Sequence, residues 1–386
     1  MSEIRIGACV AAGAGAASTW AETRPAGDVA KSWQDCSCNA DGSVILAGAY
    51  PGRLYLSADG GGTWTEARPA GDADRCWFAC AVNSDGSVLL AATNGLLGTG
   101  GRIYLSINGG ASWTEQLPAG DVNKYWECCA VNSAGTVLMV GASAGRLWLS
   151  TDSGASWTEQ RPAGNANKNW YSCSTDGDGS VLLAGTGATY EGRLYLSTNG
   201  GATWAETRPA GDVNRYWYAC DVSADGLVML AGIAGGGRLW LSINGGTDWT
   251  EQRPFGGDSD HYWLDCAVDS DGSVLLATTS KGDFGIDGRV WLSIDSGATW
   301  TSQQPNGALS SNSNWSAVSV DSDGSVILAG VRSGRLYLGG VPSSVPSSTF
   351  SVSRDSAGIL LAVRDNAAPQ FAVSRDADGI MLGAWR

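Results

Sequence analysis

The sequence has 386 residues, with 55 Gly, 18 Trp and only 1 His, and its formal net charge is −14. A chain this rich in Trp does not have the composition of a disordered one, and an acidic chain lacks the basic face that binding to phosphates requires. No apolar run approaches the roughly 20 residues of a membrane helix. We therefore expect neither a nucleic-acid partner nor membrane insertion. The first ten residues show no basic region followed by an apolar stretch, so no secretory signal is predicted and cytoplasmic synthesis is expected.

Three landmarks recur seven times along the chain. The first is a Trp preceded by Thr, Ser or Asp, the second is another Trp 13 to 15 residues later, and the third is Gly-Arg-(Leu/Ile/Val)-(Tyr/Trp)-Leu. Successive copies of the first landmark lie 44 to 51 residues apart, which indicates seven structural units. The positions are Trp20, Trp64, Trp113, Trp157, Trp204, Trp249 and Trp300; Trp33, Trp77, Trp126, Trp170, Trp217, Trp263 and Trp315; and Arg53, Arg102, Arg146, Arg193, Arg238, Arg289 and Arg335.

Each unit is predicted to contain four short strands, here called A to D. In the fifth copy, strand A covers 217–222, strand B follows an Asp-Gly turn at 228–231, strand C covers 238–242 and strand D covers 249–252. Helical periodicity is absent. Four short strands in about 45 residues, repeated, are typical of a propeller blade. The sequence therefore predicts an all-β fold, a seven-bladed β-propeller of four-stranded blades.

The two ends of the repeat region predict how the ring closes. The chain begins at a strand D, about 18–22, and the repeats end at a strand C, 335–338. Pairing of these two segments in one blade would remove exposed strand edges. The predicted domains are the propeller at 1–340, a Pro/Ser linker at 341–349 and a small tail of repeated β-hairpins at 350–386.

A turn motif separates the predicted strands C and D. In the first copy it reads Ser57-x-Asp59-x-Gly61-x-Thr63-Trp64, in which Asp caps backbone N–H groups, Gly permits positive φ and Trp packs between sheets. The motif resembles the Asp-box, or bacterial neuraminidase repeat, and the resemblance covers roughly 8–340. It implies an Asp-box β-propeller similar to sialidases and to photosystem II stability/assembly factor-type propellers, with the box as a structural turn away from the active face. The six structural Asp-box positions are Asp59, Asn108, Asp152, Asn199, Asn244 and Asp295.

No catalytic residue is assigned. The resemblance to sialidases implies an arginine triad, a Tyr nucleophile with a Glu partner and an Asp acid, whereas the arginines here recur in register and are interpreted as structural partners of strand-D Glu residues. Tyr190-Glu191 is the only non-periodic candidate pair, and nothing nominates a second carboxyl for a glycosidase. A non-repeating cluster of acids and arginines at the mouth of the ring is not found. The chain is therefore predicted not to be an enzyme.

The cysteines and acidic turns predict no metal and no cofactor. Six of the ten Cys occupy one core position of strand A, where the seventh copy has Val318, and are expected to be free thiols in a reducing compartment. The Asp-x-Asp-Gly segments at 269–272 and 321–324 lack the other ligands of a calcium loop and are interpreted as A–B turns. The six cysteines are Cys36, Cys80, Cys129, Cys173, Cys220 and Cys266.

The D–A loops hold the candidate ligand-binding residues. Six of these loops have an acid or Asn five residues before the second Trp, as at Asp28, a basic residue two before it, and in several copies an aromatic next. One interpretation is a self-satisfied loop with an Asp–Lys pair; the other is a multivalent site on the face shared with the B–C loops. The candidates are Lys31, Arg75, Lys124, Tyr125, Lys168, Arg215, Tyr216, His261 and Tyr262.

The tail contains two similar segments that start at Phe350 and Phe371, each too small for a large core. It is expected to attach the protein to a larger assembly or to form homo-oligomers. The predicted function is a non-enzymatic recognition or scaffold propeller that binds a protein or glycan partner through the D–A and B–C loop face, as a component of a virion or surface assembly. The alternatives are a multivalent propeller lectin, a sialidase-like glycoside hydrolase and an assembly chaperone.

Overall fold

The computed structural model describes residues 20–95, 100–187, 192–256, 260–280, 288–307 and 313–341, and the backbone of four strands beyond residue 349. The chain divides into two compact units, Met1–Val341 and Pro342–Arg386. In the part of the chain that is described, no helix is long and apolar enough to cross a membrane.

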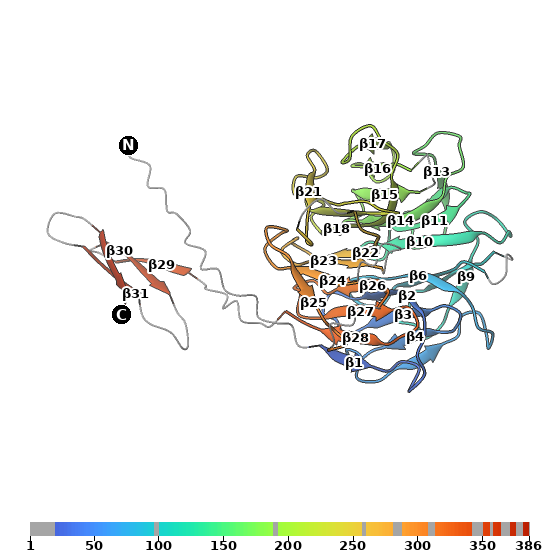
Figure 1. Ribbon diagram of the computed structural model, residues 1–386, viewed down its shortest axis with the longest axis horizontal. Coiled ribbons are helices and arrows are strands. Elements are labelled where there is room, and N and C mark those ends of the chain that lie inside the picture. The colour runs from blue at the N-terminus through green and yellow to red at the C-terminus, as the bar shows by residue number, and fades with distance from the viewer. Residues whose placement is uncertain are drawn as a thin grey trace. The chain divides into compact units, whose positions relative to one another are not determined.

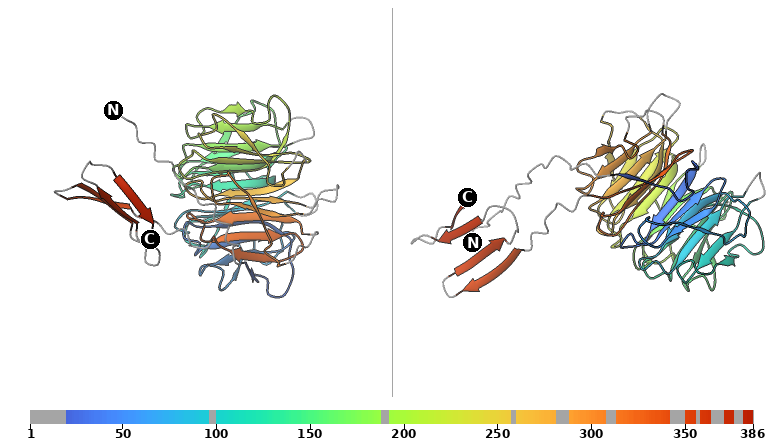
Figure 2. Two further views of the ribbon diagram at one scale, coloured as in Figure 1. Left: turned by 60° about the vertical axis from the view of Figure 1, so that its left-hand side comes forward. Right: turned by 90° about the horizontal axis from the view of Figure 1, so that it is seen from below.

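The first unit is a seven-bladed β-propeller, as predicted. It contains seven sheets of four antiparallel strands, and the inner strand of each sheet contacts the inner strands of the two neighbouring sheets. Figure 1 shows the blades following one another around a ring, so that the last, orange sheet lies beside the first, blue one. The side views of Figure 2 show the same neighbours.

The strands are named A to D from the centre of the ring outward. Strands A are β2 (Trp33–Cys38), β6 (Trp77–Val82), β10 (Tyr125–Val131), β14 (Trp170–Thr175), β18 (Tyr216–Val222), β22 (Trp263–Val268) and β26 (Trp315–Val320). Strands B are β3 (Ile45–Ala49), β7 (Leu89–Thr93), β11 (Leu138–Ser143), β15 (Leu182–Thr186), β19 (Met229–Ala234), β23 (Leu275–Thr279) and β27 (Ile327–Val331). Strands C are β4 (Leu54–Ser57), β8 (Ile103–Ser106), β12 (Leu147–Ser150), β16 (Leu194–Ser197), β20 (Leu239–Ser242), β24 (Val290–Ser293) and β28 (Leu336–Gly339). Strands D are β5 (Thr65–Ala67), β9 (Thr114–Gln116), β13 (Thr158–Gln160), β17 (Ala205–Thr207), β21 (Thr250–Gln252), β25 (Thr301–Gln303) and β1 (Ala21–Thr23).

The ring closes through the first and last strands of the propeller. Strand β1 pairs antiparallel with β28, with Ala21 opposite Leu338 and Thr23 opposite Leu336. The last blade therefore has the order β1-β28-β27-β26. This confirms the predicted closure, although the strand starts at Ala21, later than the expected 18, and residues 18–19 lie outside the described ranges.

The core lies between neighbouring blades. The Trp at or near the start of each strand A is almost completely buried; Trp77, for example, is 2% exposed. In five blades it packs against a strand-B glycine of the preceding blade: a Cβ atom added to Gly48, for example, would lie 2.9 Å from the Cβ of Trp77. At Gly232 the corresponding distance to the Cβ of Trp263 is 2.8 Å. A side chain at these glycines would require the neighbouring Trp to shift, so Gly and Trp form one close contact in these five blades, whereas Ala92 and Thr278 occupy the equivalent position in the other two.

The turns between strands C and D have the capped geometry that the motif predicts. Asp59 Oδ1 accepts hydrogen bonds from the backbone N–H of Thr63 at 2.7 Å and from the Ser57 hydroxyl at 2.8 Å. The Gly61 N–H donates to Ser57 Oγ at 2.8 Å, and Gly61 has a φ of 85°. A hydrogen bond from the Thr63 hydroxyl, followed by those from the Thr63 N–H and the Ser57 hydroxyl, lowers the pKa of Asp59 to about 2. Asn108 and Asn244 accept the equivalent backbone bonds, because one side-chain oxygen is sufficient.

The second unit contains two hairpins. Strand β29 (Phe350–Asp355) pairs with β30 (Gly358–Val363), and β31 (Phe371–Arg375) pairs with β32 (Met381–Trp385). The sequence repeat of the tail is therefore a repeat of hairpins. Most of the predicted linker, 342–349, lies outside the described residues.

Candidate functional site

One face of the ring carries both the D–A and the B–C loops, because strand A begins and strand B ends on the same side of each blade. We call it the loop face. The predicted basic residues of the D–A loops use their backbone there to join neighbouring blades. Arg75, for example, exchanges two backbone hydrogen bonds with Gly52 of the preceding blade, at 2.8 and 2.9 Å. The other bridges are Lys31–Gly334, Lys124–Gly101, Lys168–Gly145 and His261–Gly237, and the Arg215 N–H donates to the Gly192 carbonyl.

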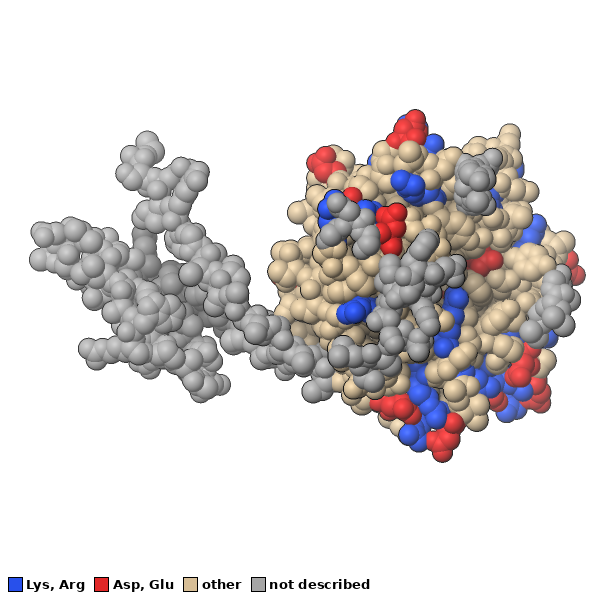
Figure 3. Space-filling view, viewed as in Figure 1, with Lys and Arg blue, Asp and Glu red and all other residues tan. Residues whose placement is uncertain are grey.

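The acids of these loops pair with arginines, so the expected Asp–Lys pairs are wrong. Asp28 accepts a hydrogen bond from Arg24, and Asp121 accepts one from Arg102 at 2.8 Å. Arginine reaches these carboxylates from the same loop or from strand C, whereas the backbone of the basic residue two before the Trp is held in the inter-blade bridge. Figure 3 shows the resulting neighbouring blue and red atoms around the rim. Asp258 lies outside the described residues.

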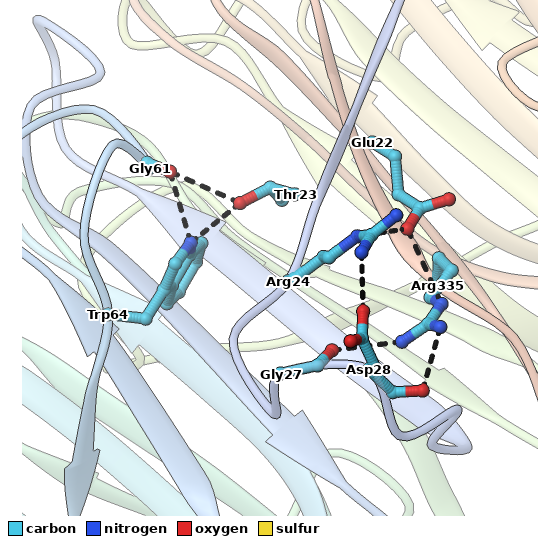
Figure 4. A network of polar contacts seen from close by, with 8 residues as sticks. All are labelled: Glu22, Thr23, Arg24, Gly27, Asp28, Gly61, Trp64 and Arg335. Atoms are coloured by element: carbon cyan, nitrogen blue, oxygen red, sulfur yellow. Dashed lines mark hydrogen bonds and ion pairs between the residues drawn. The ribbon is translucent and has the colours of Figure 1, made fainter.

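The predicted strand-C to strand-D ion pairs are present. Arg335 Nε lies 3.5 Å from Glu22 Oε1, and its guanidinium also donates to the carbonyls of Gly27 at 2.9 Å and Asp28 at 2.8 Å (Figure 4). Each such arginine ties strand C to strand D and in several blades to the D–A loop, which explains its regular recurrence. The corresponding pairs are Arg53–Glu66, Arg102–Glu115, Arg146–Glu159, Arg193–Glu206 and Arg238–Glu251.

The aromatic members of the predicted loop sites occupy different environments. Tyr125 is 40% exposed, whereas Tyr216 and Tyr262 are half-buried. His261 is buried and stacks on Phe255 with ring centroids 3.5 Å apart. Burial, followed by the charge of Arg238, lowers the pKa of His261 to about 4. The six loops are thus not six equivalent sites.

The seven inner strands line a central channel that contains a cavity of about 270 Å³. In every blade the A–B pairing shifts register just after the Trp, and such a β-bulge re-aims the side chains of the bulged strand. The residue after the Trp lines the channel and differs from blade to blade. We call this set, together with Arg332 from a B–C loop, the mouth residues: Gln34, Phe78, Glu127, Tyr171, Tyr218, Leu264, Ser316 and Arg332.

Glu127 and three tyrosines form one side of this mouth. Glu127 Oε1 accepts a hydrogen bond of 2.9 Å from the side chain of Asn94, and burial raises the pKa of Glu127 to about 7. The rings of Tyr171, Tyr216 and Tyr218 stack with centroids 4.8 to 5.8 Å apart, and we call them the tyrosine stack. Burial raises the pKa values of Tyr216 and Tyr218, and the charge of Glu127 adds to both shifts. Of the loop residues predicted to bind, Tyr216 therefore adjoins the mouth.

Three aspartates further along the channel connect the inner strands. Asp35 accepts the N–H of Cys80 in the next blade at 2.7 Å, Asp221 accepts that of Val268 at 2.8 Å, and Asp265 accepts that of Val318 at 2.8 Å. They contact channel solvent but are surrounded by protein, and this desolvation raises the pKa of Asp35 to about 7 and that of Asp221 to about 6. The same desolvation raises the pKa of Asp265.

Glu127 and Arg332, which do not recur in the other blades, both line the mouth, and no ion pair among the described residues joins them; the expectation that the mouth holds no cluster of acids and arginines stays a prediction. The sequence contains a signal for the mouth residues. When the seven copies are aligned on the second Trp, they agree at most positions and vary at the residue that follows this Trp. Only one arginine is among the described residues of the channel wall, in contrast to the arginine triad implied for sialidases. Tyr190 and Glu191 lie outside the described ranges.

The thiols and carboxyls show no metal site within the described residues, where no group of three or more His, Cys, Asp or Glu side chains could hold an ion. The nine cysteines in these ranges are free, and eight of them are buried. Burial raises the pKa of the Cys36 thiol, as it does for Cys80 and Cys266, so these positions are core residues with weak nucleophilicity.

Comparison with known proteins defines the class of fold. No protein-family model matches the sequence, and no curated protein matches it. A structure of YCF48 bound to D1 peptide aligns with a TM-score of 0.59 at 14% identity, covering 84% of this chain and 97% of that one. YCF48 from Cyanidioschyzon merolae aligns with a TM-score of 0.59 at 16% identity, covering 86% and 100%. The GH74 xyloglucanase from Xanthomonas campestris aligns with a TM-score of 0.63 at 18% identity, and this chain, 90% covered, spans 60% of its length. At such identities the likeness shows the fold, a seven-bladed β-propeller.

Proposed function

We propose that this protein is a non-enzymatic recognition or scaffold propeller that binds a segment of a protein partner at the channel mouth on the loop face. The observation that carries the proposal is the break in the repeat: the blades agree elsewhere but place different side chains after the buried Trp. Packing of identical blades does not require this variation, and the variation builds one asymmetric site on a rigid ring. Binding residues carried by a rigid scaffold are the usual arrangement of a recognition module.

The size of the cavity favours a protein segment over a sugar chain. Pockets for small ligands commonly measure about 300–1,000 Å³, and a volume of about 270 Å³ is below that range. Such a cavity is suited to one or two inserted side chains, with the rest of the partner lying on the loop face. The YCF48 structure that contains a D1 peptide supports this proposal by analogy of fold.

The two alternatives predict different chemistry. A multivalent lectin requires equivalent sites in several blades, and the different environments of Tyr125, Tyr216 and His261 do not favour it. A glycoside hydrolase is favoured by the fold shared with the GH74 xyloglucanase and by channel carboxyls with raised pKa values. Against catalysis, Asp35, Asp221 and Asp265 already accept backbone N–H groups of neighbouring strands, which gives them a structural role.

The remaining parts of the proposal concern the turns and the tail. We interpret the capped turns as Asp-box turns with a structural role. We propose that the hairpins at 350–386 attach the protein to a larger assembly, such as a virion or cell surface, or mediate homo-oligomerisation. The protein is proposed to be synthesised in the cytoplasm and to act without a cofactor.

The test is binding of the full-length chain to a peptide array and a glycan array in parallel. The channel variant is Tyr171→Leu with Tyr218→Leu, the milder Tyr171→Phe with Tyr218→Phe guards against misfolding, and the exposed rim variant Tyr125→Leu is the matched control. We expect peptide binding that the channel variant loses and the control retains. Glycan binding at about six sites per chain would establish the lectin instead, and release of reducing sugar from xyloglucan would establish the hydrolase.

A further inference from the structure

We infer that the channel mouth receives a cationic side chain of the partner, a lysine or an arginine, between Glu127 and the tyrosine stack. The inference rests on the proposed function and specifies its chemistry. It is carried by the charge of the channel lining, by the aromatic rings beside the acid and by the room available.

The channel lining contains more acids than bases. Four carboxyl groups line the cavity, those of Asp35, Glu127, Asp221 and Asp265, and Arg332 is the one basic residue among the described lining residues. No lysine or arginine in the described ranges forms an ion pair with any of these four carboxyls. Arg332 instead lies against the hydroxyl of Tyr218. A cation entering the mouth would therefore add positive charge to a wall in which four carboxyl groups outnumber one arginine, in a narrow space where Coulomb attraction is weakly screened.

Glu127 is the acid placed to meet such a cation. Asn94 donates to one of its carboxyl oxygens, whereas both carboxyl oxygens of each of the three channel aspartates accept hydrogen bonds from the protein. Tyr171 and Tyr218 occupy the position of Glu127 in the next two blades, so the acid and the rings form consecutive parts of one wall. Aromatic rings attract cations through the negative potential of their faces.

The available room fits a long aliphatic side chain with a charged end. Since one water occupies about 30 Å³ in the liquid, a cavity of about 270 Å³ has the volume of about nine waters. The methylene groups of lysine or arginine can lie along Phe78 and the tyrosine stack while the charged group reaches Glu127. Binding then replaces channel water by a compensating charge.

This arrangement makes binding dependent on pH. The pKa of Glu127 is about 7, so the carboxylate fraction, and with it the affinity for a cation, should fall about tenfold between pH 8 and pH 6. Asn94 and the tyrosine stack lie near Glu127, and Arg332 lies against Tyr218. The raised pKa values of Tyr216 and Tyr218 keep these two phenols neutral over this range. Asp35 and Asp221 titrate in the same range further along the channel, so the Glu127 variant is needed to assign the effect.

The experiment is saturation-transfer difference NMR of the full-length chain with Nα-acetyl-lysine methylamide. Its neutral counterpart Nα-acetyl-norleucine methylamide and the anionic Nα-acetyl-glutamate methylamide serve as comparison probes. We expect a signal for the lysine probe that is several-fold larger than for norleucine and that is lost in Glu127→Gln. Glu115→Gln, which removes a rim carboxylate, is the matched control and should keep the signal.

Equal signals for lysine and norleucine, or an unchanged lysine signal in Glu127→Gln, would overturn the inference. A larger signal for the glutamate probe would also overturn it and would point to Arg332. If the peptide array still shows binding that Tyr171→Leu with Tyr218→Leu abolishes, the proposed function stands while this inference fails. If array binding is also indifferent to the channel variant, both fail.

Discussion

The outer parts of the blades and the wall of the channel follow opposite rules. In strands B, C and D and their turns, the same residues recur and make the same contacts in successive blades, as in the capped turns at Asp59 and Asp152. At the mouth the blades contribute Gln, Phe, Glu, Tyr, Tyr, Leu and Ser to one position. Repetition builds the ring, because each blade must fit two similar neighbours, whereas the candidate site lies where the repeat varies.

The largest loss of stability is expected when the buried Trp at or near the start of a strand A is replaced. Trp217 is 2% exposed and lies between two blades. Trp217→Ala should lower the free energy of unfolding by about 3–5 kcal/mol, because it removes a large side chain and leaves a cavity. Chemical denaturation followed by circular dichroism measures the change. A loss below 1 kcal/mol would contradict the view that the Trp contacts hold neighbouring blades together.

A smaller and uniform effect is expected in the turns. Ser57 is 1% exposed and its hydroxyl accepts the N–H of Gly61 at 2.8 Å. Ser57→Ala should destabilise the protein by about 1–3 kcal/mol, because a largely desolvated N–H loses its acceptor. Ser242→Ala in the fifth blade should have a similar effect, since Ser242 accepts the N–H of Gly246 at 2.9 Å. Clearly different losses of stability for the two variants would show that the turns of different blades are not energetically equivalent.

The carboxyl groups of the channel wall should instead make the stability of the protein depend on pH. The folded pKa values of Asp35, about 7, and Asp221, about 6, exceed the ordinary value of 3.8. The native state then binds more protons than the unfolded chain between about pH 4 and pH 7, so stability falls as the pH rises through this range. We expect the melting temperature to be several degrees lower at pH 8 than at pH 5. In Asp35→Asn this difference should shrink, with the rim variant Asp28→Asn as the control. A melting temperature that rises with pH would refute the assignment.

The smallest effect is expected at a predicted loop residue. Lys124 joins its blade to the preceding one through its backbone, which an alanine keeps. Lys124→Ala should change the free energy of unfolding by no more than about 0.5 kcal/mol and should leave peptide binding unchanged. A strong loss of binding would indicate that the partner binds at the D–A loops of the rim and would favour the multivalent interpretation.

The sequence alone was sufficient for the ring. Seven copies of the Trp and Gly-Arg landmarks, with four strand signals in each, predicted the blade number, the closure by β1 and β28 and the strand-C to strand-D ion pairs. These features depend on contacts that every blade repeats, so their signal accumulates along the chain. The same repetition led to the prediction of candidate residues in the D–A loops, because acidic, basic and aromatic positions recur there.

Only the tertiary structure decided which side chains meet. Glu127, Tyr171, Tyr218 and Arg332 come from four blades and gather because the ring brings the starts of the inner strands to one mouth. The partner of Asp28 proved to be Arg24, because the loop turns back on itself while the backbone of Lys31 is held by Gly334. Local sequence specifies a blade through short-range pairing and periodic packing. The channel mouth depends on convergence over long distances along the chain, which no single repeat contains.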